Sequence, residues 1–326
     1  MKKNIAILRG GTSSEKVISL QSAKVVFQHI DSEKYNKYIV HIENKNWIVI
    51  QDTESYPIDK NDFSFIKNNE KISFHGVFMA IHGTPGEDGI LQGYFDLLNI
   101  PYNCCSSIAA GITFNKGICN MLLKQHQITS AKAIMIHNKN PYDFNSIEQK
   151  IGLPCIVKPN RGGSSFGISK VTKADQWKKA LKIAFKHDDQ VVVEAFIEGT
   201  ELSCGIIEKN GELIAFPITE ISTENDFFDY EAKYHGKALE ITPARINDAH
   251  KDKIQSISKK IYNILGLKGI VRMDFILKEE EPYLIEVNTV PGLSEESIIP
   301  KQAKCYGMSL QELFHNSLET MFQNND

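Results

Sequence analysis

The sequence predicts a chain of α/β and α+β class, in which an open sheet flanked by helices is followed by two smaller α+β units. The first observation behind this prediction is the start of the chain, where an apolar strand, a glycine turn and a helix begin a β-α-β layer. The second is the continued alternation of strand patterns with helices of 3.6-residue periodicity. With 326 residues, 42% of them hydrophobic, the chain can bury two or three cores.

The first domain is expected to cover residues 1–104. Residues 4–8 form an apolar strand that runs into a glycine turn at residues 10–15, and a helix follows the turn. The later elements are strands at residues 38–42, 77–81 and 100–103 and a helix at residues 88–98. The polar stretch at residues 51–71 is expected to be a surface elaboration of this domain.

The central unit is expected to cover residues 105–196. A helical pattern opens it at residues 106–127, and a second, amphipathic helix is expected at residues 173–187. The strand patterns fall at residues 131–136, 154–157, 168–171 and 191–196. A glycine-rich turn at residues 162–167 joins two of these strands.

The last unit is expected to cover residues 197–326. It begins with strands at residues 201–207 and 213–218 and passes through an irregular aromatic stretch at residues 227–234. A helix follows, with an apolar stripe at Ile254, Ile257, Ile261 and Leu265. Two more strands and the C-terminal helices complete the unit.

Charge and composition exclude several classes of protein. The formal net charge is −3, so the chain lacks the basic excess of a general nucleic-acid binder. No apolar run reaches the ~18 residues of a membrane span, and the apolar run near the N-terminus is shorter than the roughly 7–15 residues of a signal sequence. The six cysteines show no Cys-x-x-Cys spacing, which is typical of reduced thiols. We therefore expect a cytoplasmic protein that binds neither nucleic acid nor membrane.

Residues 272–277 and 283–288 are expected to pair as two strands joined by an acidic turn. Alternation along a strand places Arg272 and Asp274 on one face, and Glu286 and Asn288 on one face. If these faces meet, a rigid sheet carries one cation and three oxygen ligands. Such oxygens suit Mg²⁺, which also binds substrate phosphates. A solvent-facing hairpin with a chance salt bridge remains an alternative.

The glycine-rich turn contains the hydrolase pattern G-x-S-x-G, centred on Ser165. That motif requires a strand, a sharp turn and then a helix, but residues 168–171 continue as a strand. The Lys-Ser/Thr pair of a P-loop is also absent. A glycine loop with free backbone N–H groups beside the strand residue Lys158 is instead expected to fold over phosphates.

Polar residues also follow two strands of the first domain. Glu15 comes just after the first glycine turn, and His82 opens the motif HGTPGEDG at residues 82–89. Both lie at the carboxyl ends of strands, where open α/β sheets bind ligands. Taken alone, His82 is as compatible with a structural role as with a catalytic one.

Together these motifs resemble the D-alanine–D-alanine ligase family of ATP-grasp enzymes over nearly the whole chain. The resemblance rests on residues 10–15 (GGTSSE), 82–89 (HGTPGEDG), 158–167 (KPNRGGSSFG), 229–234 (DYEAKY), 272–274 (RMD) and 286–292 (EVNTVPG). It implies a Rossmann-like open sheet followed by the two-part ATP-grasp fold. It also implies a homodimer that joins two D-alanines through a D-alanyl phosphate, for peptidoglycan precursor synthesis.

The resemblance implies ATP and two Mg²⁺ ions as cofactors, with Mn²⁺ able to substitute. Asp274, Glu286 and Asn288 match the metal ligands. The implied nucleotide-binding residues are Lys116, Lys158, Ser165, Glu194, Ile197, Glu201 and Lys233.

The implied catalytic residues are Glu15, Ser164, Tyr234, Arg272 and Gly292, and His82, Ser297 and Ile298 match substrate-binding positions. In the family, Ser164 and Tyr234 hold Glu15, and a tyrosine at position 234 favours D-alanine over D-lactate as second substrate. Phe228 and Val17 depart from residues common in the family, but neither is an implied ligand. The alternatives are a ligase that takes D-lactate or another D-amino acid, a non-catalytic ATP-binding member of the fold, and a hydrolase that uses Ser165.

Overall fold

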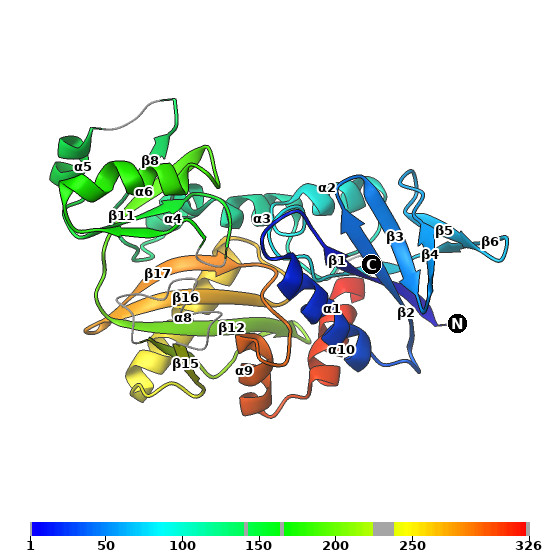
Figure 1. The fold of residues 1–326 in the computed structure, drawn as a ribbon. Helices are drawn as coiled ribbons and strands as arrows, with labels where there is room; N and C mark the ends of the chain where they lie inside the picture. Colours follow the sequence, from blue (N-terminus) through cyan, green and yellow to red (C-terminus); the bar gives the residue numbers. More distant parts are fainter. Residues whose placement is uncertain (1, 140–142, 164–165, 224–237, 324–326) are drawn as a thin grey trace.

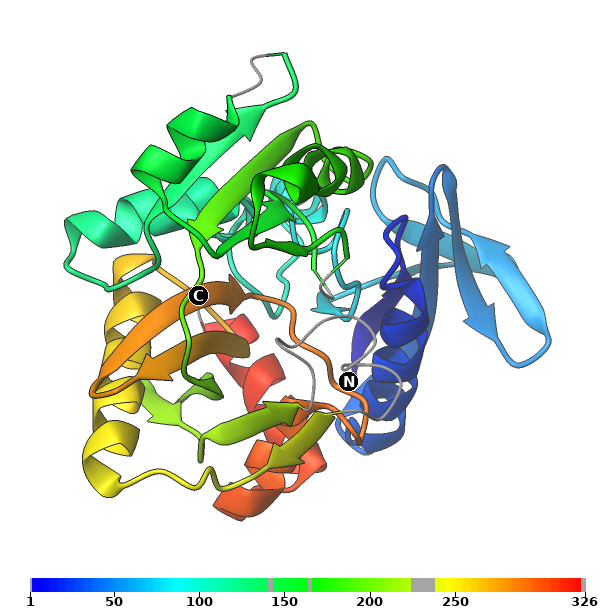
Figure 2. The same cartoon turned by 60° about the vertical axis from the view of Figure 1, so that its left-hand side comes forward.

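The computed structural model describes residues 2–139, 143–163, 166–223 and 238–323. Its strands form a five-stranded, a four-stranded and a six-stranded sheet and a small hairpin (Figure 1). In a view turned by 60°, the four-stranded unit (green) lies above the six-stranded sheet (yellow-green to orange), and the N-terminal sheet (blue) stands to one side (Figure 2). The predicted fold class is confirmed.

The N-terminal sheet has the order β4-β3-β2-β1-β7. Its strands are β1 (Lys3–Gly10), β2 (Tyr35–Glu43), β3 (Asn46–Gln51), β4 (Glu54–Pro57) and β7 (Gly76–Met79). The central strand β1 runs parallel to both β2 and β7, as a β-α-β layer requires. Helices α1 (Lys16–His29) and α2 (Ile90–Leu97) follow β1 and β7 in the chain. The glycine turns after these two strands therefore share one edge of the sheet.

Residues 51–71 are more than the surface elaboration that their polarity suggests. They contain β4 and β5 (Ser64–Lys67), which forms a hairpin with β6 (Glu70–Ser73). Phe63 and Phe65 within this stretch are 0% and 1% exposed and belong to the N-terminal core. Most of the stretch is exposed, as a surface elaboration would be, but its two aromatic side chains also contribute to the core. The strand expected at residues 100–103 is reduced to a single bridge between Tyr102 and Val77.

The four-stranded sheet has the order β10-β9-β11-β8 and is antiparallel throughout. Its strands are β8 (Ala133–His137), β9 (Cys155–Pro159), β10 (Ser169–Val171) and β11 (Gln190–Ala195). The helices of this region are α3 (Ser107–Phe114), α4 (Lys116–Gln125), α5 (Phe144–Lys150) and α6 (Trp177–Ala184), with a 3₁₀ turn at Ala174–Gln176. The helix expected at residues 106–127 breaks at Asn115, because the Asn115 side chain accepts the Ile118 N–H and caps α4.

The six-stranded sheet runs β15-β14-β12-β16-β17, with β13 paired to β12. Its strands are β12 (Thr200–Lys209), β13 (Glu212–Ala215), β14 (Thr219–Thr223), β15 (Ala238–Ile241), β16 (Val271–Lys278) and β17 (Glu281–Asn288). The helices are α8 (Asp248–Ile264), α9 (Ile298–Tyr306) and α10 (Leu310–Gln323). Strands β3, β14 and β15 are absent from the sequence-based prediction.

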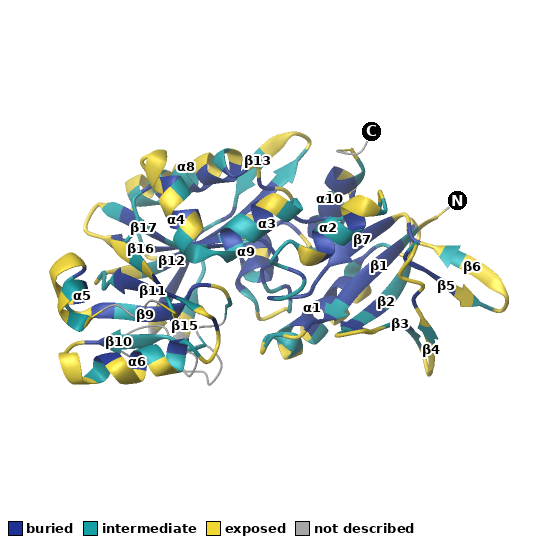
Figure 3. Cartoon of the chain, turned by 90° about the horizontal axis from the view of Figure 1, so that it is seen from above, coloured by how far each residue is buried: buried dark blue, intermediate teal, exposed yellow. Residues whose placement is uncertain are grey.

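The C-terminal helix α10 packs back onto the N-terminal sheet. Leu313 and Phe314 share a buried cluster with Ile7 of β1 and Phe78 of β7. The Phe78 and Phe314 rings meet edge to face, with centroids 5.6 Å apart. Seen from above, the sheets are mostly buried, whereas the outer faces of α5, α6 and α8 are exposed (Figure 3). The two ends of the chain are therefore joined through one core.

Candidate active site

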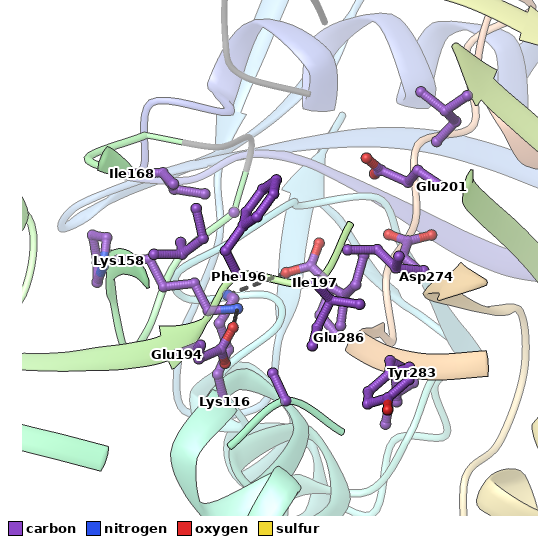
Figure 4. A pocket seen from close by; sticks show the side chains of 18 of the residues that line it. Lys116, Lys158, Ile168, Glu194, Phe196, Ile197, Glu201, Asp274, Tyr283 and Glu286 are labelled. Carbon is purple, nitrogen blue, oxygen red and sulfur yellow. Dashed lines mark ion pairs between the residues drawn. The ribbon is translucent and has the colours of Figure 1, made fainter. Parts of the chain in front are cut away.

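A cavity lies between the four-stranded and the six-stranded sheets (Figure 4). Seven of the side chains that line it belong to the predicted nucleotide, metal and oxyanion sets: Lys116, Lys158, Glu194, Glu201, Arg272, Asp274 and Glu286. Ile197 lines the same cavity from the segment after β11. Residues that are up to 170 positions apart in the sequence thus meet at one place.

The β16–β17 hairpin presents its polar residues in the predicted way. The antiparallel register pairs Arg272 with Asn288 and Asp274 with Glu286. Met273 and Phe275 point the other way and are fully buried in the core below. The two polar faces therefore meet, and the strand-alternation prediction is confirmed.

Asp274 is the centre of a dense hydrogen-bond network. Arg272 approaches its carboxylate with Nε at 2.9 Å and Nη2 at 2.7 Å, the Ser203 hydroxyl donates at 2.6 Å, and the Asn288 amide donates at 3.0 Å. Burial alone lowers the pKa of Arg272, but the charges of Asp274, Glu286 and Glu87 outweigh it, so that the pKa stays above its ordinary value. Arg272 is therefore held as a fixed cation.

Two lysines face the hairpin from the central unit. Lys116 Nζ lies 3.3 Å from Glu286 Oε2, and Lys158 Nζ lies 2.7 Å from Glu194 Oε2 (dashed lines in Figure 4). Lys158 is 3% exposed, so its charge is buried together with that of its partner. Phosphate groups in this cavity would find ammonium groups on one side and Arg272 on the other.

The donor set of the hairpin fits a hard divalent cation. Within the described part of the chain, no three His, Cys, Asp or Glu side chains gather into a metal-binding group. The two carboxylates of Asp274 and Glu286 are instead accompanied by the Asn288 amide, whose nitrogen already donates to Asp274 and whose oxygen is left as an acceptor. Mg²⁺ favours coordination by a few protein oxygens together with phosphate oxygens and water.

A second cavity adjoins the first at Arg272 and Ile298, which line both. Its other walls come from the N-terminal turns and from the segment after β17, and they include Glu15, His82, Glu87, Gly292 and Ser297. Of the predicted catalytic and substrate residues, all those that lie in the described ranges are therefore brought together here. Ser164, Ser165, Lys233 and Tyr234 lie outside the described residues.

The glycine loop is anchored at its start and approaches Glu15. Arg161 donates to the buried Asp188 from its backbone N–H at 2.6 Å and from its guanidinium. A Cβ on Gly163 would lie 2.8 Å from Glu15 Oε1, so the loop backbone passes directly over that carboxylate. Strand β10 follows the loop and pairs with β9, which is not the strand-to-helix elbow that a hydrolase nucleophile requires.

Comparison with known families matches nearly the whole of this architecture. Residues 4–105 match the model of the D-ala D-ala ligase N-terminus, and residues 122–319 match that of the D-ala D-ala ligase C-terminus. The chain belongs to the D-alanine–D-alanine ligase family. It is 48% identical over 318 residues to the D-alanine–D-alanine ligase of Flavobacterium johnsoniae, covering 97% of this chain and 98% of that one.

Two solved structures of ligases show the same fold. The VanG D-Ala:D-Ser ligase of Enterococcus faecalis superposes with a TM-score of 0.85 at 30% identity, over 98% of this chain and all of that one. The Bacillus anthracis D-alanine–D-alanine ligase complexed with ATP superposes with a TM-score of 0.80 at 26% identity, over 99% and 98% of the two chains. None of the helices in the described ranges of the present ligase is long and apolar enough to cross a membrane.

Two residues of the ligase site are missing from the sequence-based set. Glu87 lines the second cavity, where desolvation and then the charge of Glu15 raise its pKa to about 7, against the opposing effect of the Gly83 and Val290 N–H groups. Ser22 on α1 is fully buried and bonds to His82. Glu87 lies inside the HGTPGEDG motif and could have been singled out there, whereas the helical periodicity around Ser22 carries no such signal.

Proposed function

We propose that the protein joins two D-alanines to D-alanyl-D-alanine, with hydrolysis of ATP to ADP and phosphate, for peptidoglycan precursor synthesis. The observation that carries the proposal is the position of Arg272. It lies where the first cavity, lined by lysines and hard oxygen ligands, meets the second cavity, lined by the predicted substrate-binding residues. An arginine there can face a phosphoryl group and a carbonyl oxygen at once.

The reaction would proceed in two steps. A carboxylate oxygen of the first D-alanine attacks the γ-phosphorus of ATP, the bond to ADP breaks, and D-alanyl phosphate forms. The amine of the second D-alanine then attacks the acyl carbon, the carbon–oxygen bond to phosphate breaks, and the amine loses a proton. Both steps depend on positioning and on neutralisation of charge rather than on covalent help from the protein.

Lys116 and Lys158 would bind the phosphates from the central unit, and Lys233 and the backbone around Ser165 would do so from the loops. Glu194 would accept from the adenine amine, and Glu201 would bind the ribose hydroxyls. The ion pairs of Lys116 with Glu286 and of Lys158 with Glu194 support this role, because each lysine is already directed into the cavity. Ile197 would meet the adenine edge through its backbone.

Asp274, Glu286 and Asn288 would hold magnesium, and Mn²⁺ could take its place. When bound, two such ions neutralise the phosphate charge. Arg272 and the Gly292 N–H would then stabilise the oxyanion of the tetrahedral intermediate. Loss of one such donor typically costs about 3–4 kcal/mol of transition-state stabilisation.

The first D-alanine would be bound through its ammonium by Glu15, which Ser164 and Tyr234 would hold in place, with His82 nearby. Ser297 and the Ile298 N–H would bind the carboxylate of the second. The grouping of Glu15, His82, Ser297 and Ile298 around one cavity supports this assignment.

D-serine is the second candidate for the second substrate, because the D-Ala:D-Ser ligase of E. faecalis has the same fold at 30% identity. D-lactate is less favoured, because Tyr234 matches the D-alanine-accepting pattern. The higher identity to a D-alanine–D-alanine ligase, 48%, favours D-alanine.

A product assay tests the proposal. The enzyme is given ATP and Mg²⁺ with D-alanine, D-serine, D-lactate or L-alanine, alone and in competition, and both ADP and the ligated product are measured. We expect ADP release to require D-alanine and the main product to be D-alanyl-D-alanine. Nucleotide binding without turnover would indicate a non-catalytic member, and stimulation only by another acid would overturn the substrate assignment.

Three further statements belong to the same proposal. The domain boundaries at residues 104 and 196 are retained, although α10 packs against the N-terminal sheet. A homodimer is expected from the family and is tested by light scattering. A cytoplasmic location is proposed because ATP and free D-alanine are its substrates, and fractionation of cells tests it.

A further inference from the structure

Side chains from the N-terminal part of the chain form hydrogen bonds with the backbone of residues 290–293, the segment that follows β17. The Val290 N–H donates to Glu87 Oε1 at 3.4 Å, and the Val290 carbonyl lies 2.7 Å from His82 Nδ1. At the other end of the segment, the Leu293 N–H donates to Ser22 Oγ at 3.0 Å. Three backbone groups of this short segment are therefore held by three side chains that lie about 200 or more positions earlier.

The hydrogen-bond roles in this cluster follow from the chemistry of the partners. A carbonyl oxygen can only accept, so Nδ1 of His82 carries the proton that points to Val290. In the neutral imidazole, Nε2 of His82, 2.9 Å from Ser22 Oγ, then accepts the Ser22 hydroxyl proton, and the same hydroxyl oxygen accepts from Leu293. Leu293, Ser22, His82 and Val290 thus form one continuous chain of donors and acceptors.

The cluster is buried, which makes its geometry restrictive. Ser22 is 0% exposed, His82 and Leu293 are 3% exposed, and Val290 is 4% exposed. His82 and Val290 line the second cavity, but Ser22 and Leu293 do not, so a hydrogen bond broken between these two leaves a buried group unsatisfied. The segment is therefore confined by its partners and not only by its own backbone.

Gly292 lies between Val290 and Leu293, whose backbone groups these hydrogen bonds hold. Among the residues that the structure describes, no group accepts a hydrogen bond from its N–H. A Cβ on Gly292 would come within 2.8 Å of Ser297 Oγ, so the glycine packs directly against the proposed second-substrate residue. Pro291, which precedes it, removes one further degree of freedom from the segment.

We propose that Ser22 and His82 are positioning residues, which set the place of the Gly292 N–H and of Ser297 by clamping residues 290–293. The inference rests on the proposed function, in which Gly292 donates to the oxyanion. In this assignment His82 acts through Val290 and Leu293. Its ring nitrogens form hydrogen bonds with protein groups rather than with the substrate.

The clamp also links the two substrate sites. Helix α1 begins immediately after Glu15, and Ser22 lies two turns farther along the same helix. A shift of α1 would therefore move the group that faces the first substrate's ammonium and the group that holds the oxyanion donor together. Catalysis benefits from such shared support, because misplacement by 1 Å can cost about 100-fold in rate.

The test uses the full-length enzyme with Ser22→Ala, His82→Asn and His82→Gln. Asparagine can place an amide N–H near Nδ1 and keep the bond to Val290, whereas glutamine places its amide near Nε2 and loses it. We expect kcat to fall about 10-fold in Ser22→Ala and His82→Gln and less in His82→Asn, with ATP binding unchanged. Ser317→Ala is the matched control, because Ser317 is also a buried serine that accepts one hydrogen bond, from Asn103, and it lines neither of the two cavities of the site.

A second readout does not depend on activity. Hydrogen exchange of the peptide that contains residues 288–298 should accelerate in Ser22→Ala and His82→Gln and stay unchanged in Ser317→Ala. Unchanged exchange with unchanged kcat would overturn the clamp. A rise in the KM for D-alanine in both His82 variants but not in Ser22→Ala would assign His82 to direct substrate binding instead. If the wild type makes no dipeptide while exchange responds as expected, the proposed function fails and the clamp stands.

Discussion

Gly163 brings the backbone of the glycine loop against the Glu15 carboxylate. The closest approach of a Cβ built there is 2.8 Å to one carboxylate oxygen and 2.9 Å to the other, closer than a real Cβ tolerates. Gly292 has the same relation to Ser297. At two points of this site, the absence of a side chain lets a backbone segment reach a functional group.

We expect Gly163→Ala to lower kcat/KM for D-alanine about 10- to 100-fold, because either the loop or Glu15 must move by a few tenths of an ångström or more. Steady-state kinetics with D-alanine as the varied substrate measure the effect. Thermal stability should change little, since Glu15 is a flexible side chain that can yield.

Gly93→Ala is the control for this substitution. Gly93 lies inside α2, where the nearest atom to a new Cβ is 4.0 Å away. Alanine is favoured over glycine in a helix by roughly 0.5–1 kcal/mol, so stability should rise by about that amount while activity stays the same. Wild-type kinetics in Gly163→Ala would show that the loop does not rest on Glu15 during turnover.

Among the elements, the loop between β9 and β10 depends on one anchor at its base. Asp188 accepts hydrogen bonds from the Arg161 N–H and guanidinium and from the Gln190 N–H. Burial by itself raises the pKa of Asp188, but these donors outweigh it and hold the pKa below its usual range. The carboxylate therefore fastens the loop to the turn that precedes β11.

We expect Asp188→Asn to raise the KM for ATP by up to about 10-fold and to lower the free energy of unfolding by about 1–3 kcal/mol at pH 7. The reason is that a hydrogen-bonded, charged acceptor is replaced by a neutral one in a buried place. Because the folded-state pKa is depressed, the stabilising contribution is present above the unfolded value and is lost as the pH falls through the folded value. Unfolding of wild type and variant should therefore converge in acid.

Asp189→Asn is the comparison, since the Asp189 side chain is half exposed and contacts only side-chain nitrogens, those of Arg161 and His137, among the ion pairs of the described residues. An exposed ion pair of this kind contributes less than about 1 kcal/mol. Equal losses in both variants would mean that burial of Asp188 is not what fixes the loop.

On the scale of the whole molecule, the N-terminal sheet and the C-terminal half are tied together at two places. One is the apolar cluster of α10 with β1 and β7, and the other is the polar cluster around residues 290–293. Glu87 belongs to the second, where it accepts from Gly83 of its own turn and from Val290 of the C-terminal half. The ionisation of Glu87 is therefore coupled to the contact between the N-terminal sheet and the C-terminal half of the chain.

Glu87→Gln should change how stability depends on pH. The pKa of Glu87 rises from 4.5 to about 7 in the folded protein, so the folded state binds a proton more tightly than the unfolded state between these values. Wild-type stability relative to the variant should then fall as the pH rises from about 4.5 to about 7, by on the order of 3 kcal/mol, and stay level above that. Thermal unfolding of both proteins at a series of pH values measures this difference.

The exposed Glu33 provides the control as Glu33→Gln, which should change the stability at pH 7 by no more than about 0.5 kcal/mol. A difference between wild type and Glu87→Gln that does not change with pH would mean that Glu87 is not held as a carboxyl group beside Glu15.

Much of the fold could be predicted because hydrophobic periodicity and turn-forming residues are local features of the sequence. The alternation of Arg272, Met273, Asp274 and Phe275 defines which side chains share a face, and the register of β16 with β17 confirmed it. Residues 51–71 could not be assigned in this way, because the burial of Phe63 and Phe65 depends on partners such as Phe74 and Phe95. Strand β14 pairs with β12 on one side and with β15 on the other, and nothing in the sequences of β14 and β15 indicates these partners.

The residues of the site also differ in whether the local sequence could predict them. Asp274, Glu286 and Asn288 could be found from strand geometry, and the other site residues followed from the resemblance of their motifs. Ser22 could not be found, because a serine on a helix has no distinguishing pattern until His82 and Leu293 are placed against it. The pKa of Glu87 likewise depends on Glu15 and on burial, which are properties of the assembled site.

The sequence by itself determined the class of the fold, the order of its motifs and which side chains of the β16–β17 hairpin share a face, because these follow from side-chain periodicity and from residues close in the chain. Only the tertiary structure decided that Arg272 lies at the junction of two cavities and that Ser22 and His82 hold residues 290–293. The physical reason is that hydrogen bonds and burial between distant segments depend on how the sheets are packed. That packing is a property of the whole chain and of no single motif in it.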